Sequence, residues 1–451
     1  MKTYLSLNIY EYEKIIVLLA MMLVTFTACN NEDFEEISLD SKREKISYEV
    51  TPEEAVSRLG MFLSNNGTRA SLNDVTIKTL MKSDFVPATR SSNAEDAPAV
   101  YLIDIPDGGC AVMGADKRLE PVYAIMDETK LSPEDLVVAS TRTESTEDED
   151  IQTFVTGLIN DAVKADIMGH GGIVIDTTEL IPNPYPHDEE WIDTTILNQI
   201  SPLLNTKWHQ NAPFNNNYPI CSSGVRKYAG CGVIAAAQIL YKNRKPNSIN
   251  GIAFDWDLIS QYEYDYSSTP SLSARIEIAN YVHTIAQASN AELDNGVPPT
   301  GSPVNDMVSF FSQCGYTNVS LESYTYSAVE AMLSNNHPIW MWGAYNYDDP
   351  AHAWVVDGCL EYKFDYWIRD YKEPPIMVGE LPYEEYIYKT QYIDLVHCNY
   401  GWGGKCDGYY TSGVFDLRNE LHINNIDTSI GDFAGTDDYY NTYLEIIKYT
   451  N

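Results

Sequence analysis

The sequence predicts an α+β protein with two folded regions, and three observations lead to this expectation. A capped helical pattern begins at Thr51, and strand-like segments follow it up to residue 125. Much further along, an apolar helical pattern starts at Cys231, and an apolar strand pattern starts at His352. A chain of 451 residues has room for roughly two to three domains, so we expect these patterns to belong to separate regions.

The first 29 residues have the features of an export signal. The apolar run of residues 15–26 is short for a membrane span but suits the hydrophobic part of a signal peptide. The small residue before Cys29 resembles a bacterial lipobox, in which Cys29 is lipidated and begins the mature protein. Phe26 departs from the aliphatic residue usual at its place, and an ordinary secretory signal or a membrane anchor is the alternative.

Residues 30–47 read as an acidic tether, similar to the signals that send lipoproteins to the outer surface of Bacteroides-like Gram-negative bacteria. We therefore expect an exported protein, held at the outer membrane or cell surface through Cys29 or released after processing.

A small α+β domain is expected over residues 48–185. Thr51 is placed as the N-cap of a helix, with Pro52 in the first turn and Glu54 three residues after the cap. Strands are expected at residues 99–105, 110–114 and 121–125. Three alternating prolines lie within residues 181–188, which excludes regular structure, so we place a linker at 186–195 and a second domain at 196–451.

The composition narrows the possible partners. The chain has 29 Lys and Arg against 65 Asp and Glu, a net charge of −36, and this charge repels nucleic acid and anionic lipid surfaces. Eight cysteines are present; without Cys29 and Cys231, six remain that form three disulfides or none. Cys398 and Cys406 are close enough in sequence to pair across a loop.

Cys231 is the candidate nucleophile. Gly230 permits a tight turn before it, and the apolar face that follows predicts a helix beginning at the cysteine. A helix N-terminus favours the thiolate, and the Cys231 N–H can face a developing oxyanion. Gln210, about twenty residues upstream, is the candidate second donor. The alternatives are a buried helix-cap cysteine and a surface glutamine.

His352 is the candidate general base. It stands at the start of an apolar strand, where it can lie beside the thiol, although a structural histidine is the alternative. His397 is its nearest rival. Asn399 can accept the imidazole N–H, and Trp402 can shield that hydrogen bond from water.

At these residues the chain resembles the streptopain family of secreted bacterial cysteine peptidases, over roughly residues 195–445. The motifs that carry the resemblance are Gln-x-x-Pro-Phe-Asn at 210–215, Gly-Cys followed by Ala-Ala-Gln-Ile at 230–239, His-Ala-x-Val-x-Asp-Gly at 352–358 and Asn-x-Gly-Trp-Gly-Gly at 399–404. The resemblance implies a papain-like fold, with Cys231 as nucleophile and His352 as general base and acid. It also implies that Gln210 lies in the oxyanion hole, that Asn399 orients the histidine, and that the first domain is an inhibitory propeptide.

Two departures from the family pattern stand beside these residues. Ala351 replaces the usual glycine and Tyr400 the usual tryptophan; with Trp402 and Gly230 they are expected to support substrate binding. The resemblance implies an exported zymogen of a cysteine endopeptidase, acting on proteins or peptides, inhibited by its own prodomain, and needing no metal or other cofactor. Two alternatives are a catalytically idle surface binding lipoprotein of the same fold and an acyl transferase that uses the same Cys–His pair.

Overall fold

The structure is a computed structural model, and it describes residues 49–65, 72, 74–86, 96–106, 108–137, 147–170, 193–263, 270–293, 296–297, 300–344, 351–372, 383–415 and 443–451. The chain divides into two compact units. The smaller comprises residues 1–46, 176–188 and 369–385, and the larger comprises residues 47–175, 189–368 and 386–451. The contacts below all lie in the larger unit. The predicted signal segment with Cys29, the tether and most of the predicted linker fall outside the described residues.

The N-terminal part of the larger unit combines short strands with helices on both sides. Its elements are α2 (Pro52–Asn65), β1 (Thr76–Met81), α3 (Lys82–Phe85), β2 (Pro98–Asp104), β3 (Cys110–Gly114), β4 (Val122–Met126), α4 (Pro133–Val137) and α5 (Glu147–His170). The helix predicted after Thr51 is confirmed, because the Glu54 N–H donates to Thr51 Oγ1 over 3.1 Å. The three predicted strands are confirmed as β2, β3 and β4.

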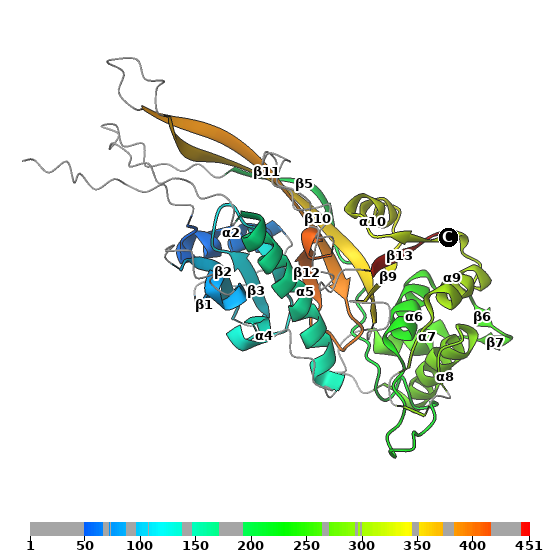
Figure 1. Ribbon diagram of the computed structural model, residues 1–451. Coiled ribbons are helices and arrows are strands. Elements are labelled where there is room, and N and C mark those ends of the chain that lie inside the picture. Colours follow the sequence, from blue (N-terminus) through cyan, green and yellow to red (C-terminus); the bar gives the residue numbers. More distant parts are fainter. Residues whose placement is uncertain are drawn as a thin grey trace, which may run out of the picture. The chain divides into compact units, whose positions relative to one another are not determined.

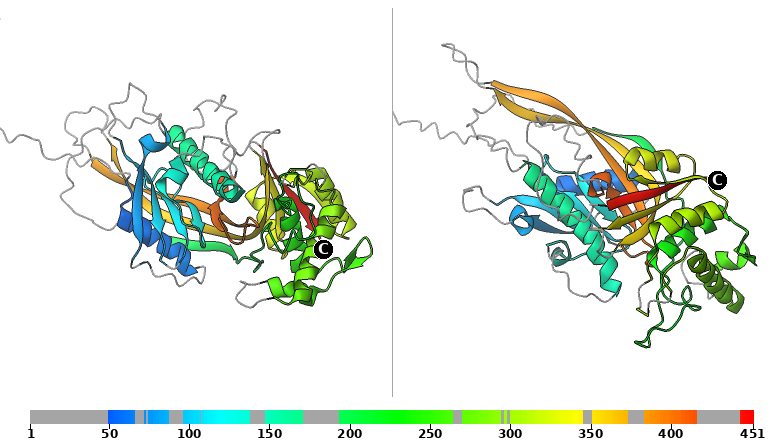
Figure 2. Two further views of the ribbon diagram at one scale, coloured as in Figure 1. Left: turned by 90° about the horizontal axis from the view of Figure 1, so that it is seen from below. Right: turned by 45° about the vertical axis from the view of Figure 1, so that its right-hand side comes forward.

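Helices α2 and α5 cover opposite faces of these strands, as Figure 2 shows. Alternate residues of a strand point to opposite faces. In β2, Val100 and Leu102 therefore pack in one hydrophobic cluster with α5, whereas Tyr101 and Ile103 pack in a second cluster with α2.

The remainder of the larger unit carries the candidate site. Its elements are β5 (Asp193–Ile200), α6 (Cys231–Asn243), β6 (Ser248–Ile249), β7 (Ile252–Ala253), α7 (Trp256–Ile259), the 3-10 turn η1 (Ser260–Tyr262), α8 (Leu272–Ala288), α9 (Val304–Gln313), β8 (Thr317–Ser323), α10 (Tyr326–Leu333), β9 (Ile339–Ala344), β10 (His352–Lys372), β11 (Tyr383–Asn399), β12 (Gly408–Thr411), the 3-10 turn η2 (Ser412–Val414) and β13 (Tyr443–Thr450). Figure 1 shows α6, α7, α8 and α9 grouped beside β9 and β13. The predicted helix at Cys231 and strand at His352 are confirmed.

One 11-stranded sheet runs through both parts in the order β1-β2-β3-β4-β12-β11-β10-β9-β13-β8, with β5 paired to β10. The junction between the parts is the antiparallel pairing of β4 with β12. The predicted α+β class is confirmed, and the sheet places the start of β10 next to β9, with His352 opposite Gly343. In the part of the chain that the structure describes, no helix is both long and apolar enough to cross a membrane.

Candidate active site

Cys231 is the first residue of α6, and the turn before it requires glycine. Gly230 has φ 90°, and a Cβ there would come within 2.8 Å of the Thr300 carbonyl oxygen. The next ten residues of α6 are all buried, so the core fixes the helix direction. The thiol therefore lies at a helix N-terminus, where backbone N–H groups and the helix dipole favour negative charge.

The structure brings Cys231 and His352 together. Strand β10 starts at His352, and the Ala353 N–H donates to Cys231 Sγ over 3.4 Å. Burial raises the pKa of the Cys231 thiol, but the hydrogen bond and charge of His352 and the N–H groups of Ala353 and Gly232 lower it. The net pKa lies below the ordinary value of 9.0, which favours a thiolate–imidazolium pair.

A helix of the N-terminal part covers His352. The His352 side chain is buried, and its ring centroid lies 4.6 Å from that of Phe154 on α5. The Phe154 ring also lies 5.7 Å from Trp354, two residues further along β10. In this arrangement α5 occupies one side of the Cys–His pair.

Asn399, at the end of β11, is held by groups other than His352. Its Oδ1 accepts from Gln238 Nε2 at 3.0 Å and from the Gly401 N–H at 3.1 Å, and its Nδ2 donates to the Thr206 carbonyl at 2.7 Å. The two donors occupy both lone pairs of Oδ1. The predicted contact from His352 is not among these bonds, so a role for Asn399 in orienting the histidine stays a prediction.

Gln238 is the residue of this site to which the sequence reasoning assigned no role. It is fully buried, and its Oε1 accepts from Thr206 Oγ1 at 2.6 Å while its Nε2 binds Asn399. The signal was present in the sequence, because a polar residue within an apolar helix needs buried hydrogen-bond partners. Gln238 joins α6 to the end of β11, two turns after Cys231.

Gln210 lies near the entry to α6. Its side chain is buried, and its backbone carbonyl accepts from the Ala229 N–H at 2.9 Å, two residues before the thiol. The predicted surface alternative for Gln210 is therefore wrong, because the residue is only 7% exposed. Its role as an oxyanion donor stays a prediction.

The other expected site residues differ in their surroundings. Tyr400 is buried in the core with its ring 5.5 Å from that of Trp354, so it supports the site from within. Trp402 is partly buried against the same core, and Ala351, half-buried, directly precedes β10.

His397 is buried and belongs to a separate cluster of charged groups. Its Nδ1 lies 2.6 Å from Asp357 Oδ1, and its Nε2 lies 3.4 Å from Asp127 Oδ2, in the N-terminal part. Burial lowers the pKa of His397, but Asp357 and Asp127 outweigh it and raise the pKa to about 10. This histidine is therefore held as a cation by two carboxylates, a role unlike that of a general base.

The seven cysteines that the structure describes are all unpaired, including Cys398 and Cys406, both buried. Among the described residues, His, Cys, Asp and Glu form no group of three or more that could hold a metal ion.

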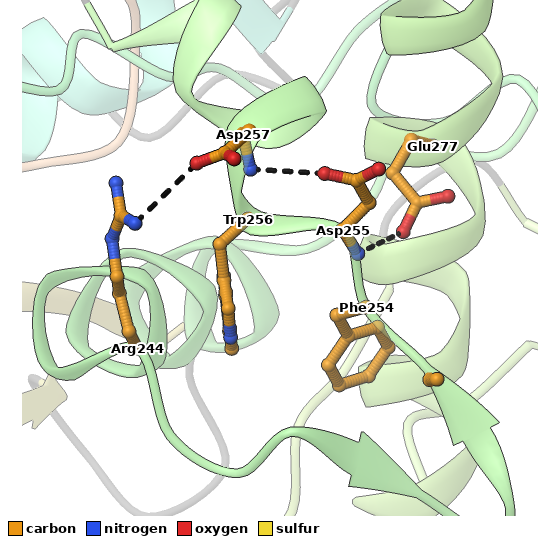
Figure 3. A pocket seen from close by; sticks show the side chains of 7 residues that line it. Arg244, Phe254, Asp255, Trp256, Asp257 and Glu277 are labelled. Carbon is orange, nitrogen blue, oxygen red and sulfur yellow. Dashed lines mark hydrogen bonds and ion pairs between the residues drawn. The ribbon is translucent and has the colours of Figure 1, made fainter.

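A pocket of about 480 Å³ lies at the other end of α6, around Arg244 (Figure 3). Its lining residues are Arg244, Ala253, Phe254, Asp255, Trp256, Asp257 and Glu277. Since a helix rises about 1.5 Å per residue, the 13 residues of α6 put this pocket about 20 Å from Cys231. It takes no part in the chemistry of the Cys–His pair.

A cysteine with a lowered pKa at a helix N-terminus, hydrogen-bonded to a histidine, is the arrangement of enzymes that use a thiolate nucleophile. Residues 208–410 match the peptidase C10 family. This match confirms the resemblance to the streptopain family of cysteine peptidases that the motifs indicated.

Two solved structures from Prevotella intermedia are similar to the chain. A prointerpain A fragment is 17% identical, with 83% of this chain and 98% of that chain covered and a TM-score of 0.49. The active interpain A cysteine protease is 19% identical, with 55% and 94% covered and a TM-score of 0.39. Neither likeness is high enough to assign a residue of this chain. No curated protein matches the sequence.

Proposed function

We propose that the chain is the exported zymogen of a cysteine endopeptidase, with Cys231 as nucleophile and His352 as general acid and base. The observation that carries this proposal is the contact between these two side chains at the start of α6, where the pKa of the thiol is lowered. The family match supports the proposed reaction class, and the geometry of the pair supports the choice of these two residues.

The proposed reaction begins with acylation of Cys231, assisted by His352. The Cys231 thiolate attacks the carbonyl carbon of a peptide bond, a C–S bond forms, and the negative charge moves to the carbonyl oxygen. The Cys231 N–H and the Gln210 amide are the proposed donors to this oxyanion. The His352 imidazolium then gives its proton to the amine nitrogen as the C–N bond breaks, which leaves a thioester.

Water completes the cycle. His352, now neutral, takes a proton from the water that attacks the thioester carbon. The C–S bond breaks, the carboxylic acid leaves, and the thiolate is restored beside a protonated histidine. No other reactant is consumed, so the products are the two parts of the hydrolysed peptide.

The N-terminal part is the proposed inhibitory propeptide. The support is the contact of Phe154 with His352, because a ring 4.6 Å from the imidazole occupies space that a substrate would need. Cleavage in the proline-rich stretch near residues 182–195 is the proposed first step of activation. Export, with anchoring through Cys29, is proposed from the N-terminal sequence alone.

Incubation of the purified chain beside Cys231→Ala tests the proposal. After removal of the N-terminal part, the protein with Cys231 should digest an unfolded protein substrate and be labelled by a thiol-reactive peptidase inhibitor, and the variant should do neither. If the trimmed protein shows neither proteolysis nor labelling, the peptidase proposal fails. Labelling without proteolysis would favour an idle binding protein, and ligation to an added amine in place of hydrolysis would favour an acyl transferase.

A further inference from the structure

We infer that residues 49–170 stay bound to residues 193–451 as a separate chain after the connection between them is cut, so that a single cut does not release the N-terminal part. The inference rests on the proposed function for its meaning, since it describes how the proposed zymogen is regulated. Its support is the interface itself.

The backbone contact at this interface is a shared sheet. Gly408, Tyr409 and Tyr410 of β12 pair with Met126, Ile125 and Ala124 of β4. The ladder continues beyond β4, because the Asp127 N–H donates to the Asp407 carbonyl over 2.9 Å and the Cys406 N–H donates to Thr129 Oγ1 over 2.6 Å. None of these bonds involves a residue of the segment that connects the two parts, residues 171–192.

The fit at this junction depends on glycine. A Cβ on Gly408 would lie 2.3 Å from the Ile125 carbonyl oxygen and 2.7 Å from the Met126 Cα. Since no side chain can occupy that space, β12 accepts β4 at van der Waals contact only because residue 408 is glycine.

Apolar side chains join the two parts on the α2 face of the sheet. The ring centroid of Phe62 on α2 lies 4.6 Å from that of Tyr362 and 5.7 Å from that of Phe364, both on β10. All three side chains are buried, in one cluster with Leu395 of β11 and Tyr409 of β12. Aromatic residues buried in this way contribute most of the energy of an interface.

The α5 face carries a second apolar contact, made by Phe154 with His352 and Trp354. A partly buried charged contact also crosses the junction, where the half-exposed Asp127 meets the buried His397. The exposed ion pair between Lys207 and Glu128 also crosses the junction, but exposed pairs contribute little. The interface therefore resembles a domain core, and such interfaces hold permanent partners together.

Release of the N-terminal part would thus require a second event, such as a cut that destroys β4 or α2. A cut within residues 171–192 removes none of the contacts described above, because they all lie outside that segment. Until that second event, residues 49–170 would remain bound and act as an inhibitory subunit.

The test uses Cys231→Ala protein, so that it does not depend on peptidase activity. A recognition site for a sequence-specific protease is placed within residues 182–186, and the protein is cut and run on a sizing column at about 0.1 µM. We expect both fragments to elute together at the size of the uncut chain. Separate elution of the two folded fragments would overturn the inference while leaving the peptidase proposal untouched.

Two variants identify the contacts responsible. Phe62→Ala in the cut protein should raise the dissociation constant about 100-fold or more, because it removes a buried aromatic ring. Lys207→Ala, the matched control at the exposed ion pair, should change it by less than about five-fold. If the two variants weaken association equally, the apolar contact does not hold the fragments and the inference fails. Gly408→Ala, which places a Cβ against β4, replaces Phe62→Ala if that variant is unfolded before the cut.

Discussion

At the scale of single residues, the state of Cys231 depends on a balance of opposing effects. Burial raises the pKa of its thiol, whereas His352 and two backbone N–H groups lower it further than burial raises it. Among the effects that lower this pKa and favour the thiolate, the hydrogen bond and charge of His352 are the largest.

This balance predicts the effect of removing the imidazole. In His352→Ala the pKa of Cys231 should rise above its ordinary value of 9.0, because burial then acts with less opposition. The rate of alkylation of Cys231 at pH 6 should fall at least about ten-fold, and the midpoint of the rate against pH should move upward. Cys231→Ala gives the background from other thiols. Equal midpoints in the parent protein and in His352→Ala would mean that His352 does not stabilise the thiolate.

Gln238 leads to a second prediction at this scale. Gln238→Leu keeps the volume but leaves Thr206 Oγ1 without its acceptor and removes one donor from Asn399 Oδ1. We expect a loss of about 1–3 kcal/mol in the free energy of unfolding, measured by urea denaturation in the Cys231→Ala background. Gln287→Leu, on the exposed side of α8, is the control and should change it by less than about 0.5 kcal/mol. A loss no larger than that of the control would contradict a structural role for the Gln238 bonds.

At the scale of elements, α5 is the helix that contacts His352 and is proposed to limit access to the Cys–His pair. In the uncut chain, Phe154→Ala should speed alkylation of Cys231 several-fold, because the ring over His352 is removed while α5 remains. Leu158→Ala removes a buried side chain one turn further along the same helix and is the control for general loosening. Faster labelling in both variants alike would show that Phe154 acts through stability and not through cover.

Local elements could be predicted from the sequence, but their long-range pairing could not. The cap at Thr51 and the apolar periodicity after Cys231 are local signals, and both elements formed as expected. The pairing of β4 with β12 joins residues almost 300 positions apart, and Gly408 reads in the sequence as an ordinary turn glycine. The need for glycine at residue 408 becomes clear only from the structure, where a Cβ would collide with the Ile125 carbonyl oxygen.

The same limit applies to the candidate site. The motifs identified Cys231 and His352, because the apolar helix pattern after the cysteine and the apolar strand pattern after the histidine can be recognised in the sequence. The structure places the two residues in contact. The partners of Asn399 were not readable, since they come from a loop, from α6 and from its own turn at Gly401. A side-chain amide with partners 161 and 193 positions away leaves no periodic trace in the sequence.

At the scale of the whole molecule, the two parts share a partly buried group of charges. His397 on β11 faces Asp357 of β10 and Asp127 beyond β4, and the Tyr409 ring of β12 packs against it at 4.9 Å. Asp407, just before β12, is also buried and accepts from the Tyr400 N–H at 2.8 Å. Burial raises the pKa of Asp407 to about 7, although the Tyr400 N–H and His397 oppose this.

Both raised pKa values make the folded molecule less stable as the pH rises. A group whose pKa is higher in the folded state binds more protons there than in the unfolded chain, so its contribution is full below the ordinary pKa and lost above the folded one. For Asp407 this range runs from its ordinary 3.8 to about 7, and for His397 from 6.5 to about 10.

The variant Asp407→Asn should therefore flatten the fall in stability between about pH 4 and pH 7 and leave the fall above pH 7, which belongs to His397, in place. The amide keeps an oxygen for the Tyr400 N–H but has no proton to lose. Urea midpoints of the Cys231→Ala protein with and without the substitution, at several pH values, measure the difference, in which the other titrating groups cancel. Asp257→Asn, at a side chain 93% exposed, is the control and should reproduce the parent curve. If Asp407→Asn also follows the parent curve throughout, Asp407 does not couple the fold to pH in this range.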